Sequence, residues 1–186
     1  MSPTSGSASA AAGAEPHVVV VGLPGVGKSS AARRAARRLG RPFIDFDSEI
    51  ERREGMLIEQ IFEEKGEKYF RARELELTRE LACESGMVMA PGGGWVTSTE
   101  AMDLLLPRSI MIYLRARPEL ALARLRRAKK VRPLLRANDP LAVLRRLHDE
   151  RHGAYMRAHH VLDIATMTPT AVINEIVRLA GGPGAR

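Results

Sequence analysis

A glycine-rich segment that ends in a lysine and a hydroxyl carries the clearest chemical signal in the chain. It runs from Gly22 to Ser29, reads GLPGVGKS, and follows an apolar run of four valines. Glycines allow the backbone to curl so that successive N–H groups converge on phosphate oxygens. The Lys28 ammonium then suits the β- and γ-phosphates of a nucleotide, and the Ser29 hydroxyl suits Mg²⁺. The segment predicts a nucleotide-phosphate site at the start of a helix. The alternative is an ordinary glycine-rich turn.

Two carboxylates, Asp45 and Asp47, follow the next apolar run. In an extended segment, side chains two residues apart point the same way, so both carboxylates could address one site. Beside bound nucleotide phosphates, one carboxylate suits Mg²⁺ and the other can hold the hydroxyl of an acceptor. The alternative is a pair of turn or helix-cap aspartates, since a helix is expected from Ser48.

Arginines at two further positions could bind an acid. Arg71 and Glu74 are three residues apart on an expected helix, which is close enough for them to pair. Such a pair is either a weak surface ion pair or a device that holds the planar guanidinium rigid for a carboxylate, and the spacing fits both. Arg151 and Tyr155 share one face of a later helix. A surface arginine is the default interpretation of Arg151, as it is of Arg132.

Two loops complete the set of candidate site segments. Gly92 to Gly94 directly follow another apolar run and offer a close backbone approach to a ligand. Arg132 lies in a basic connection, which we interpret as a mobile lid.

The apolar runs alternate with helical periodicity along the chain, which predicts an α/β fold with a parallel sheet covered on both faces. We expect strands at 18–22, 42–45, 87–90, 109–114 and 161–164. We expect helices at 28–39, 48–65 in two pieces, 67–84, 118–128, 140–159 and 169–180. Each candidate group falls after a strand or in a connection, where ligands of such folds bind.

Composition limits the remaining possibilities. The chain has 186 residues, of which 45% are apolar, enough for one well-filled core. Residues 1–16 are rich in Ser, Ala, Gly and Pro and lack the pattern of a secretory signal, so we expect a disordered tail before a single domain at 17–182. No apolar segment approaches a membrane span. The single cysteine, Cys83, fits a reducing cytoplasm.

The net charge of +7 raises the question of nucleic-acid binding. However, the arginines are spread along expected helices without interleaved aromatic residues that could stack on bases. We therefore expect small anionic substrates and no nucleic-acid or membrane partner, and we expect a monomer.

Taken together, these motifs resemble those of the shikimate kinases, in the nucleoside-monophosphate-kinase-like group of P-loop proteins. The resemblance covers nearly everything after residue 17, in the family's order and approximate spacing. The residues that carry it are Gly22 to Ser29, Asp45 to Asp47, Gly55 with Ile61 and Phe62, Gly66 and Glu67 with Phe70, Arg71 and Glu74, Gly92 to Gly94 with Val96 to Ser98, Arg132 to Leu135, and Arg151 with Tyr155.

The resemblance implies a three-layer α/β/α fold whose five-stranded parallel sheet has the order 2-3-1-4-5. It implies a substrate-binding segment at about 46–76, a lid at about 126–140, and phosphorylation of the 3-hydroxyl of shikimate by ATP and Mg²⁺. The implied catalytic residues are Lys28, Asp47 and Arg132. The implied ATP-binding residues are Gly25, Val26, Gly27, Lys28, Ser29, Ser30 and Arg132. Shikimate would be bound by Asp47, Arg71, Gly93, Gly94 and Arg151, and Mg²⁺ by Ser29 and Asp45.

Three residues depart from the family pattern. Trp95 follows the glycines where a small residue is usual, Pro91 precedes them, and Arg157 stands where an acidic residue is frequent. Trp95 either packs in the core or reshapes the acceptor pocket. Two alternatives therefore remain: a kinase of another hydroxy-acid such as gluconate, and a ligand-sensing domain that no longer catalyses.

Overall fold

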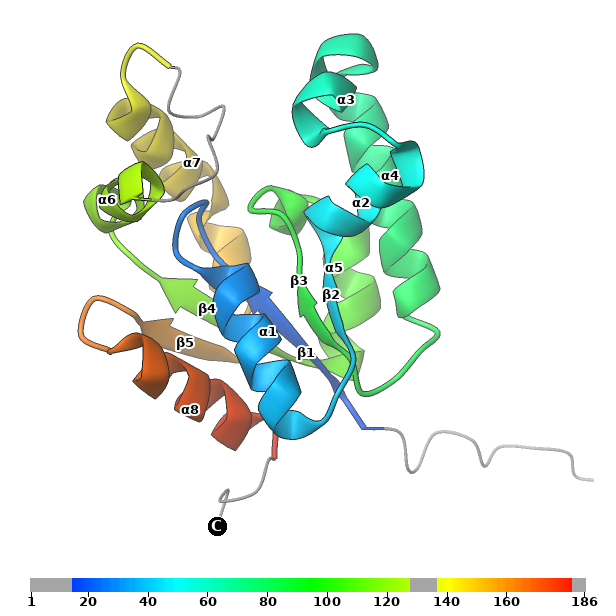
Figure 1. Ribbon diagram of the computed structural model, residues 1–186, viewed down its shortest axis with the longest axis vertical. Coiled ribbons are helices and arrows are strands. Elements are labelled where there is room, and N and C mark those ends of the chain that lie inside the picture. Colours follow the sequence, from blue (N-terminus) through cyan, green and yellow to red (C-terminus); the bar gives the residue numbers. More distant parts are fainter. Residues whose placement is uncertain (1–14, 128–136, 182–186) are drawn as a thin grey trace, which may run out of the picture.

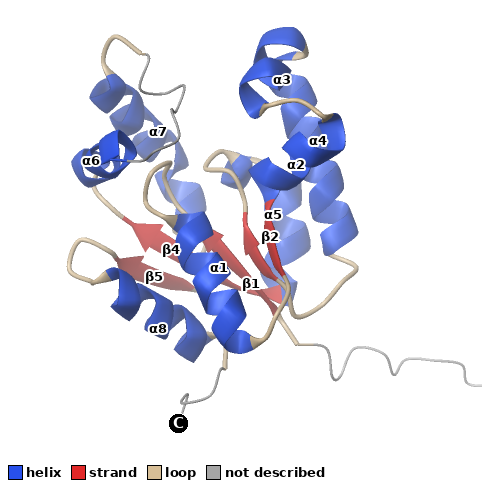
Figure 2. Cartoon of the chain, in the orientation of Figure 1, coloured by secondary structure: helices blue, strands red, loops and turns tan. Residues whose placement is uncertain are grey.

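Five parallel strands form the centre of the fold (Figure 2). The computed structural model describes residues 15–127 and 137–181. The strands are β1 (His17–Val21), β2 (Phe43–Asp45), β3 (Val88–Ala90), β4 (Ser109–Arg115) and β5 (His160–Asp163). Their order in the sheet is β2-β3-β1-β4-β5, and every neighbouring pair is parallel, which confirms the expected topology.

Helices cover both faces of this sheet and complete the expected three-layer fold. They are α1 (Lys28–Leu39), α2 (Phe46–Glu54), α3 (Ile58–Glu64), α4 (Gly66–Leu81), α5 (Thr99–Leu105), α6 (Pro118–Arg127), α7 (Pro140–Tyr155) and α8 (Pro169–Leu179). Figure 1 shows α1 and α8 in front of the sheet and α5 and α7 behind it. Because the sheet is covered on both sides, its central strand is apolar throughout, and Val18, Val19 and Val20 are fully buried.

The sheet brings three of the candidate segments to one edge. Gly22 follows β1, Asp45 ends β2, and Pro91 follows β3, and these three strands are neighbours. Asp45 is in register with Ala90 across the β2–β3 pair. The carboxyl ends of parallel strands meet at the same edge, so the phosphate loop, the aspartates and the glycine loop start close together.

Most expected elements are present, with bounds that differ by a few residues. The sequence analysis missed α5 and two short 3₁₀ segments, η1 (Trp95–Thr97) and η2 (Leu106–Arg108). The expectation of an extended chain through Asp45 and Asp47 was wrong, because α2 begins at Phe46. Asp45 caps this helix by accepting a hydrogen bond from the Ser48 N–H at 3.0 Å, which is the helix-cap alternative.

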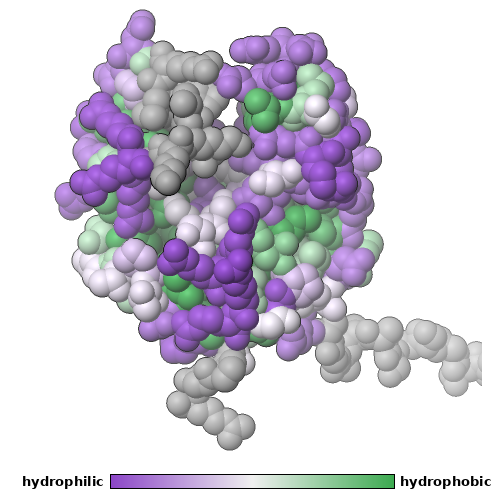
Figure 3. Space-filling model, viewed as in Figure 1, coloured by the Kyte–Doolittle hydropathy of each residue, from purple (hydrophilic) through white to green (hydrophobic). Residues whose placement is uncertain are grey.

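Parts of two expected segments lie outside the described residues: 1–14 of the tail and 128–136 of the lid, the latter including Arg132. Glu15 and Pro16 are described, and both contact Arg41, which pairs with the Glu15 carboxylate at 3.0 Å and donates to the Pro16 carbonyl. Figure 3 shows that the front face is mostly hydrophilic along α1, with hydrophobic residues gathered beside that helix. Among the described helices, none combines the length and apolar character that a membrane crossing requires.

Gly22 makes the turn from β1 into the phosphate loop. Its φ is +148°, and a Cβ there would lie 2.7 Å from the Leu114 carbonyl oxygen. Gly40, at the end of α1, also has a positive φ (+66°), but a Cβ there would meet no atom within 4 Å.

We expect Gly22→Ala to lower the free energy of unfolding by about 2–5 kcal/mol, because a strained φ and a backbone collision add together. Gly40→Ala should cost only about 1–2 kcal/mol, since it meets the strain without the collision. Urea denaturation of both variants measures the difference. Equal losses would show that the contact with Leu114 does not constrain the turn.

Candidate active site

The loop after β1 has the geometry of a phosphate-binding loop. Gly25 and Gly27 have φ values of +86° and +92°, and α1 begins at Lys28 with Gly27 as its N-cap. Because glycine has no side chain with which to cap the helix, the first N–H groups of α1 can bind an anion. The Lys28 ammonium donates to the Leu23 carbonyl at 3.2 Å, which folds the side chain back over the loop.

Helix α6 supports this loop from outside. The Arg124 guanidinium donates to the Val26 carbonyl at 3.0 Å. A Cβ on Gly25 would lie 2.7 Å from the Ala121 carbonyl oxygen and collide with Leu125, so only glycine allows α6 to pack this closely. The conformation of the phosphate loop therefore depends on a helix about 100 residues further along the chain.

The second glycine loop, Gly92 to Gly94, is surrounded by charged side chains. A Cβ on Gly92 would lie 2.9 Å from Asp47 Oδ1 and 3.0 Å from Glu74 Oε1. A Cβ on Gly94 would overlap with the Arg71 guanidinium. The absence of side chains thus lets a carboxylate pair and an arginine approach the backbone of one short loop.

The same loop touches both the phosphate loop and α7. A Cβ on Gly93 would lie 3.1 Å from Pro24 Cδ and 3.3 Å from Arg151 Nη1. The Gly93 carbonyl accepts a hydrogen bond of 2.8 Å from the Tyr155 hydroxyl. The structure therefore brings Asp47, Arg71, Gly93, Gly94 and Arg151 together beside the phosphate loop.

Tyr155 anchors the helix that carries Arg151. Its ring is fully buried and stacks on Tyr113, with centroids 4.7 Å apart and an interplanar angle of 11°. Burial raises the pKa of Tyr155, so the hydroxyl stays a donor at neutral pH. Because Arg151 lies one helical turn before Tyr155, the hydrogen bond to Gly93 also positions the guanidinium.

The expected ion pair between Arg71 and Glu74 is present, and its carboxylate partner is buried. Arg71 Nη1 lies 2.5 Å from Glu74 Oε2, and Arg71 Nη2 lies 2.8 Å from Glu67 Oε1. Only 3% of the Glu74 side chain is exposed, and its Oε1 atom has no hydrogen-bond partner among the described residues. The Glu74 carboxylate thus binds the guanidinium at Nη1 and holds it in place from the buried side.

The Glu74 carboxyl is poised to titrate near neutral pH. Burial is the largest cause and raises its pKa, the nearby Asp47 carboxylate also raises it, and the positive charges of Arg71 and Arg151 lower it. The net result is a pKa of about 7. Four charged side chains from α2, α4 and α7 therefore influence one another here.

Ser29 and Asp45 supply oxygen atoms that suit Mg²⁺. Within residues 15–127 and 137–181, no group of three or more His, Cys, Asp or Glu side chains could hold a metal ion. Mg²⁺ usually binds through one or two carboxylates together with substrate phosphates and waters. Ser29, in the first turn of α1, and Asp45, at the end of β2, offer oxygen ligands of the type that such an ion uses.

Sequence reasoning identified the charged residues of the site but missed their buried supports. It gave no role to Thr78, and it left Trp95 between two interpretations. Only the spacing of Arg71, Glu74 and Thr78 at i, i+3 and i+7, which places them on one helix face, could have pointed to Thr78.

A phosphate loop at the carboxyl edge of a parallel sheet, facing a carboxylate and two arginines, defines a P-loop kinase. The sequence model of the shikimate kinase family matches residues 24–180. A shikimate kinase from Burkholderia thailandensis is 41% identical over 166 residues, which is 88% of this chain and 90% of that protein. The chain belongs to the shikimate kinase family.

Solved structures agree with this assignment. The shikimate kinase from Acinetobacter baumannii, in complex with shikimate, has a TM-score of 0.82 and 38% identity, and the match covers 88% of this chain and 92% of that one. A gluconokinase from Sinorhizobium meliloti has a TM-score of 0.54 and 18% identity, covers 89% of each chain, and shares the fold alone.

We expect Glu74→Gln to flatten the pH dependence of stability. The pKa of Glu74 is about 7 in the folded protein against 4.5 as its ordinary value, so the folded protein binds more protons between these values. The free energy of unfolding contributed by Glu74 therefore falls as pH rises from about 4.5 to 7, by up to about 3 kcal/mol. Because glutamine does not titrate, the Gln variant should not lose stability over this pH range.

Urea denaturation at a series of pH values measures the slope. The control is Glu67→Gln, which removes the exposed partner of Arg71 and leaves Glu74 in place. An unchanged slope in the Glu74 variant would contradict the assignment.

Proposed function

We propose that the chain transfers the γ-phosphoryl group of ATP to the 3-hydroxyl of shikimate. One observation carries this proposal: Pro24 of the phosphate loop and Arg151 of α7 both approach Gly93, since a Cβ there would lie 3.1 Å from Pro24 Cδ and 3.3 Å from Arg151 Nη1. A nucleotide phosphate on the phosphate loop and an acid held by that arginine would therefore bind near the same glycine. A small carboxylated alcohol is a ligand that this arrangement accommodates.

At the acceptor end, Arg71 and Arg151 bind the carboxylate of shikimate, because a guanidinium matches a carboxylate with two parallel hydrogen bonds. Asp47 binds the ring hydroxyls, and the backbone of Gly93 and Gly94 packs against the ring. The close approach of Asp47 and Arg71 to this loop supports these roles.

At the nucleotide end, the backbone of Gly25, Val26 and Gly27, with the start of α1 at Lys28, Ser29 and Ser30, binds the phosphates of ATP. Lys28 contributes the positive charge at the β- and γ-phosphates. Arg132, which lies outside the described residues, stays a prediction as a further phosphate ligand. Ser29 and Asp45 would hold Mg²⁺, which neutralises phosphate charge when bound.

The chemistry of this reaction needs positioning and charge more than covalent catalysis. Asp47 orients the 3-hydroxyl toward the terminal phosphorus and accepts its proton as the new O–P bond forms and the bond from that phosphorus to the bridging oxygen breaks, which releases ADP. Lys28 stabilises the negative charge that accumulates on the transferred group. Exclusion of water from the site prevents hydrolysis of ATP.

Two other functions use the same framework: phosphorylation of gluconate, and ligand sensing without catalysis. The presence of Lys28, Ser29 and Asp47 favours catalysis, and two arginines beside Asp47 favour shikimate. An ADP-release assay with ATP and Mg²⁺ on shikimate, quinate and gluconate separates the three. Turnover with shikimate alone is expected, and turnover with gluconate alone would overturn the proposal.

A monomeric state, a cytoplasmic location and the absence of a nucleic-acid partner remain part of this proposal. Many of the arginines that make the chain basic are paired with acidic side chains on the surface, which supports small anionic ligands over a nucleic acid. These pairs include Arg53 with Glu80, Arg79 with Glu100, Arg115 with Asp163, Arg145 with Glu119, Arg157 with Asp103 and Arg178 with Glu175.

We expect Arg71→Lys to raise the KM for shikimate about 10- to 100-fold and to leave the KM for ATP within about twofold, because a lysine cannot form the two-pronged contact. The matched control is Arg73→Lys on the same helix, where the arginine pairs with Glu76 at 2.8 Å. Steady-state kinetics with each substrate varied in turn measure the effect. Equal changes in both KM values would refute the carboxylate role.

We expect Lys28→Ala to lower kcat by about 100-fold or more, because it removes a charge that stabilises the transition state. Lys65→Ala removes an ammonium that pairs with Glu54 at 2.8 Å on α2 and serves as the control. The ADP-release assay at saturating substrates measures kcat. Turnover of the Lys28 variant at the rate of the unmodified protein would sink the assignment.

A further inference from the structure

Trp95, which departs from the pattern of the family, begins a buried hydrogen-bond chain. Only 1% of its surface is exposed, and its indole N–H donates to the Thr78 hydroxyl oxygen at 2.8 Å. The Thr78 hydroxyl in turn donates to the Glu74 carbonyl at 2.7 Å, and Thr78 is fully buried. The residue after the glycine loop is thus tied to the helical turn that carries Glu74.

This link continues a series of contacts between the glycine loop and one face of α4. Arg71, Glu74 and Thr78 share that face, because they are three and four residues apart. Gly94 lies against Arg71, Gly92 against Glu74, and Trp95 against Thr78. The last of these contacts is a buried, directional hydrogen bond, so it sets how closely the loop approaches the arginine.

The indole also reaches the helix that carries Asp47. It meets the Phe46 ring edge-on, with centroids 6.3 Å apart and an interplanar angle of 75°. Phe46 is fully buried and directly precedes Asp47. One side chain therefore contacts the elements that hold Arg71, Glu74 and Asp47.

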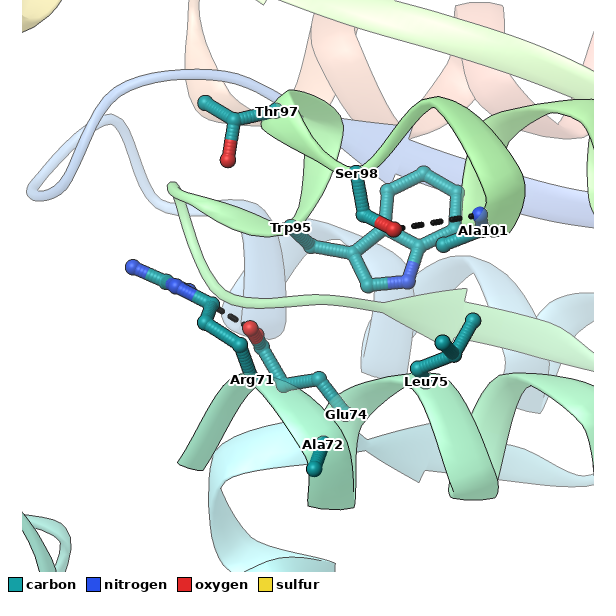
Figure 4. Close-up of a pocket in the computed structure, with 8 residues that line it drawn as sticks. All are labelled: Arg71, Ala72, Glu74, Leu75, Trp95, Thr97, Ser98 and Ala101. Carbon is teal, nitrogen blue, oxygen red and sulfur yellow. Dashed lines mark hydrogen bonds and ion pairs between the residues drawn. The ribbon is translucent and has the colours of Figure 1, made fainter. Parts of the chain in front are cut away.

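The indole borders a pocket on the side that faces α4. A cavity of about 330 Å³ lies beside it, between α4 on one side and η1 and α5 on the other. Figure 4 shows Trp95 and Ser98 on one wall of this cavity and Arg71, Glu74 and Leu75 on the other. Because the indole is almost fully buried, its packing and the hydrogen bond to Thr78 together fix its direction.

We propose that Trp95, through Thr78, is a positioning residue for the acceptor end of the site. It fixes the distance between the glycine loop and α4, and this distance lets Arg71 reach the carboxylate of the acceptor. This inference rests on the proposed function, since it assigns Arg71 to the acceptor.

Two variants break the same hydrogen bond from opposite ends. Trp95→Phe keeps an aromatic ring and removes the N–H donor, and Thr78→Val keeps the shape and removes the hydroxyl acceptor. Each should raise the KM for shikimate about 5- to 20-fold and leave the KM for ATP within about twofold. The double variant should be no worse than Thr78→Val alone, because that variant already lacks the Trp95–Thr78 hydrogen bond together with the bond to the Glu74 carbonyl.

Two further variants separate positioning from general stability. Thr78→Ser keeps the hydroxyl and should restore the KM for shikimate to within about twofold of the unmodified protein. Tyr69→Phe removes a different hydrogen bond on α4, the 2.8 Å bond from Tyr69 to Glu54, and should leave both KM values unchanged. Melting temperatures of all variants reveal any loss of stability that accompanies these effects.

Fluorescence provides an independent measurement, because Trp95 is the single tryptophan of the chain. Titration with shikimate should shift or quench its emission, whereas a matched titration of Thr78→Val should respond only at about 5- to 20-fold higher concentrations.

Unchanged KM values for shikimate in both hydrogen-bond variants would overturn the inference, as would equal increases in the KM for shikimate and for ATP. If the unmodified protein shows no transfer to shikimate, the proposed function itself fails. If the unmodified protein transfers phosphate to shikimate and the variants behave like it, the inference about Trp95 fails while the proposed function stands.

Discussion

A short loop without side chains holds the acceptor end of this site together. Each of its three carbonyl groups accepts a hydrogen bond. The Gly92 carbonyl accepts from the backbone N–H of Trp95, the Gly93 carbonyl from the Tyr155 hydroxyl, and the Gly94 carbonyl from the Thr97 hydroxyl. These bonds fix a conformation in which charged groups from α2, α4 and α7 lie against the backbone. A single methyl group at any of the three glycines would displace at least one of them.

Burial of the Glu74 carboxylate costs free energy, and this cost bears on what the residue does. Removing a carboxylate from water destabilises the fold unless a nearby positive charge compensates, and buried ion pairs often contribute no net stability. Here Arg71 provides the partner charge while keeping 28% of its own side chain exposed. The pair therefore makes more sense as a support that orients an arginine toward the site than as a source of stability.

Features that depend on neighbouring residues in the sequence could be predicted, whereas features that depend on contacts between distant segments could not. Valine runs and helical periodicity located the sheet and most helices, since parallel strands must be apolar on both faces. Asp47 was assigned the wrong local conformation, because a helix begins at Phe46, directly after the strand ends at Asp45. The burial of Glu74 was not predictable, since it arises from packing against Gly92, on a separate strand connection. Helix α5 had a readable signal, the Ser98 cap, but its length of seven residues gives little periodicity.

The two ends of the site are built by different parts of the chain, and they meet at one contact. The phosphate loop depends on β1, α1 and α6, whereas the acceptor end depends on α2, α4, α7 and the glycine loop. These parts adjoin at Pro24 and Gly93, where a Cβ on the glycine would lie 3.1 Å from Pro24 Cδ. In a reaction that needs an oxygen aligned behind a phosphorus atom, the distance between the two ligands matters more than the strength of either binding site. A side chain on Gly93 would collide with Pro24 and push the two loops apart, so the glycine is what permits their close approach.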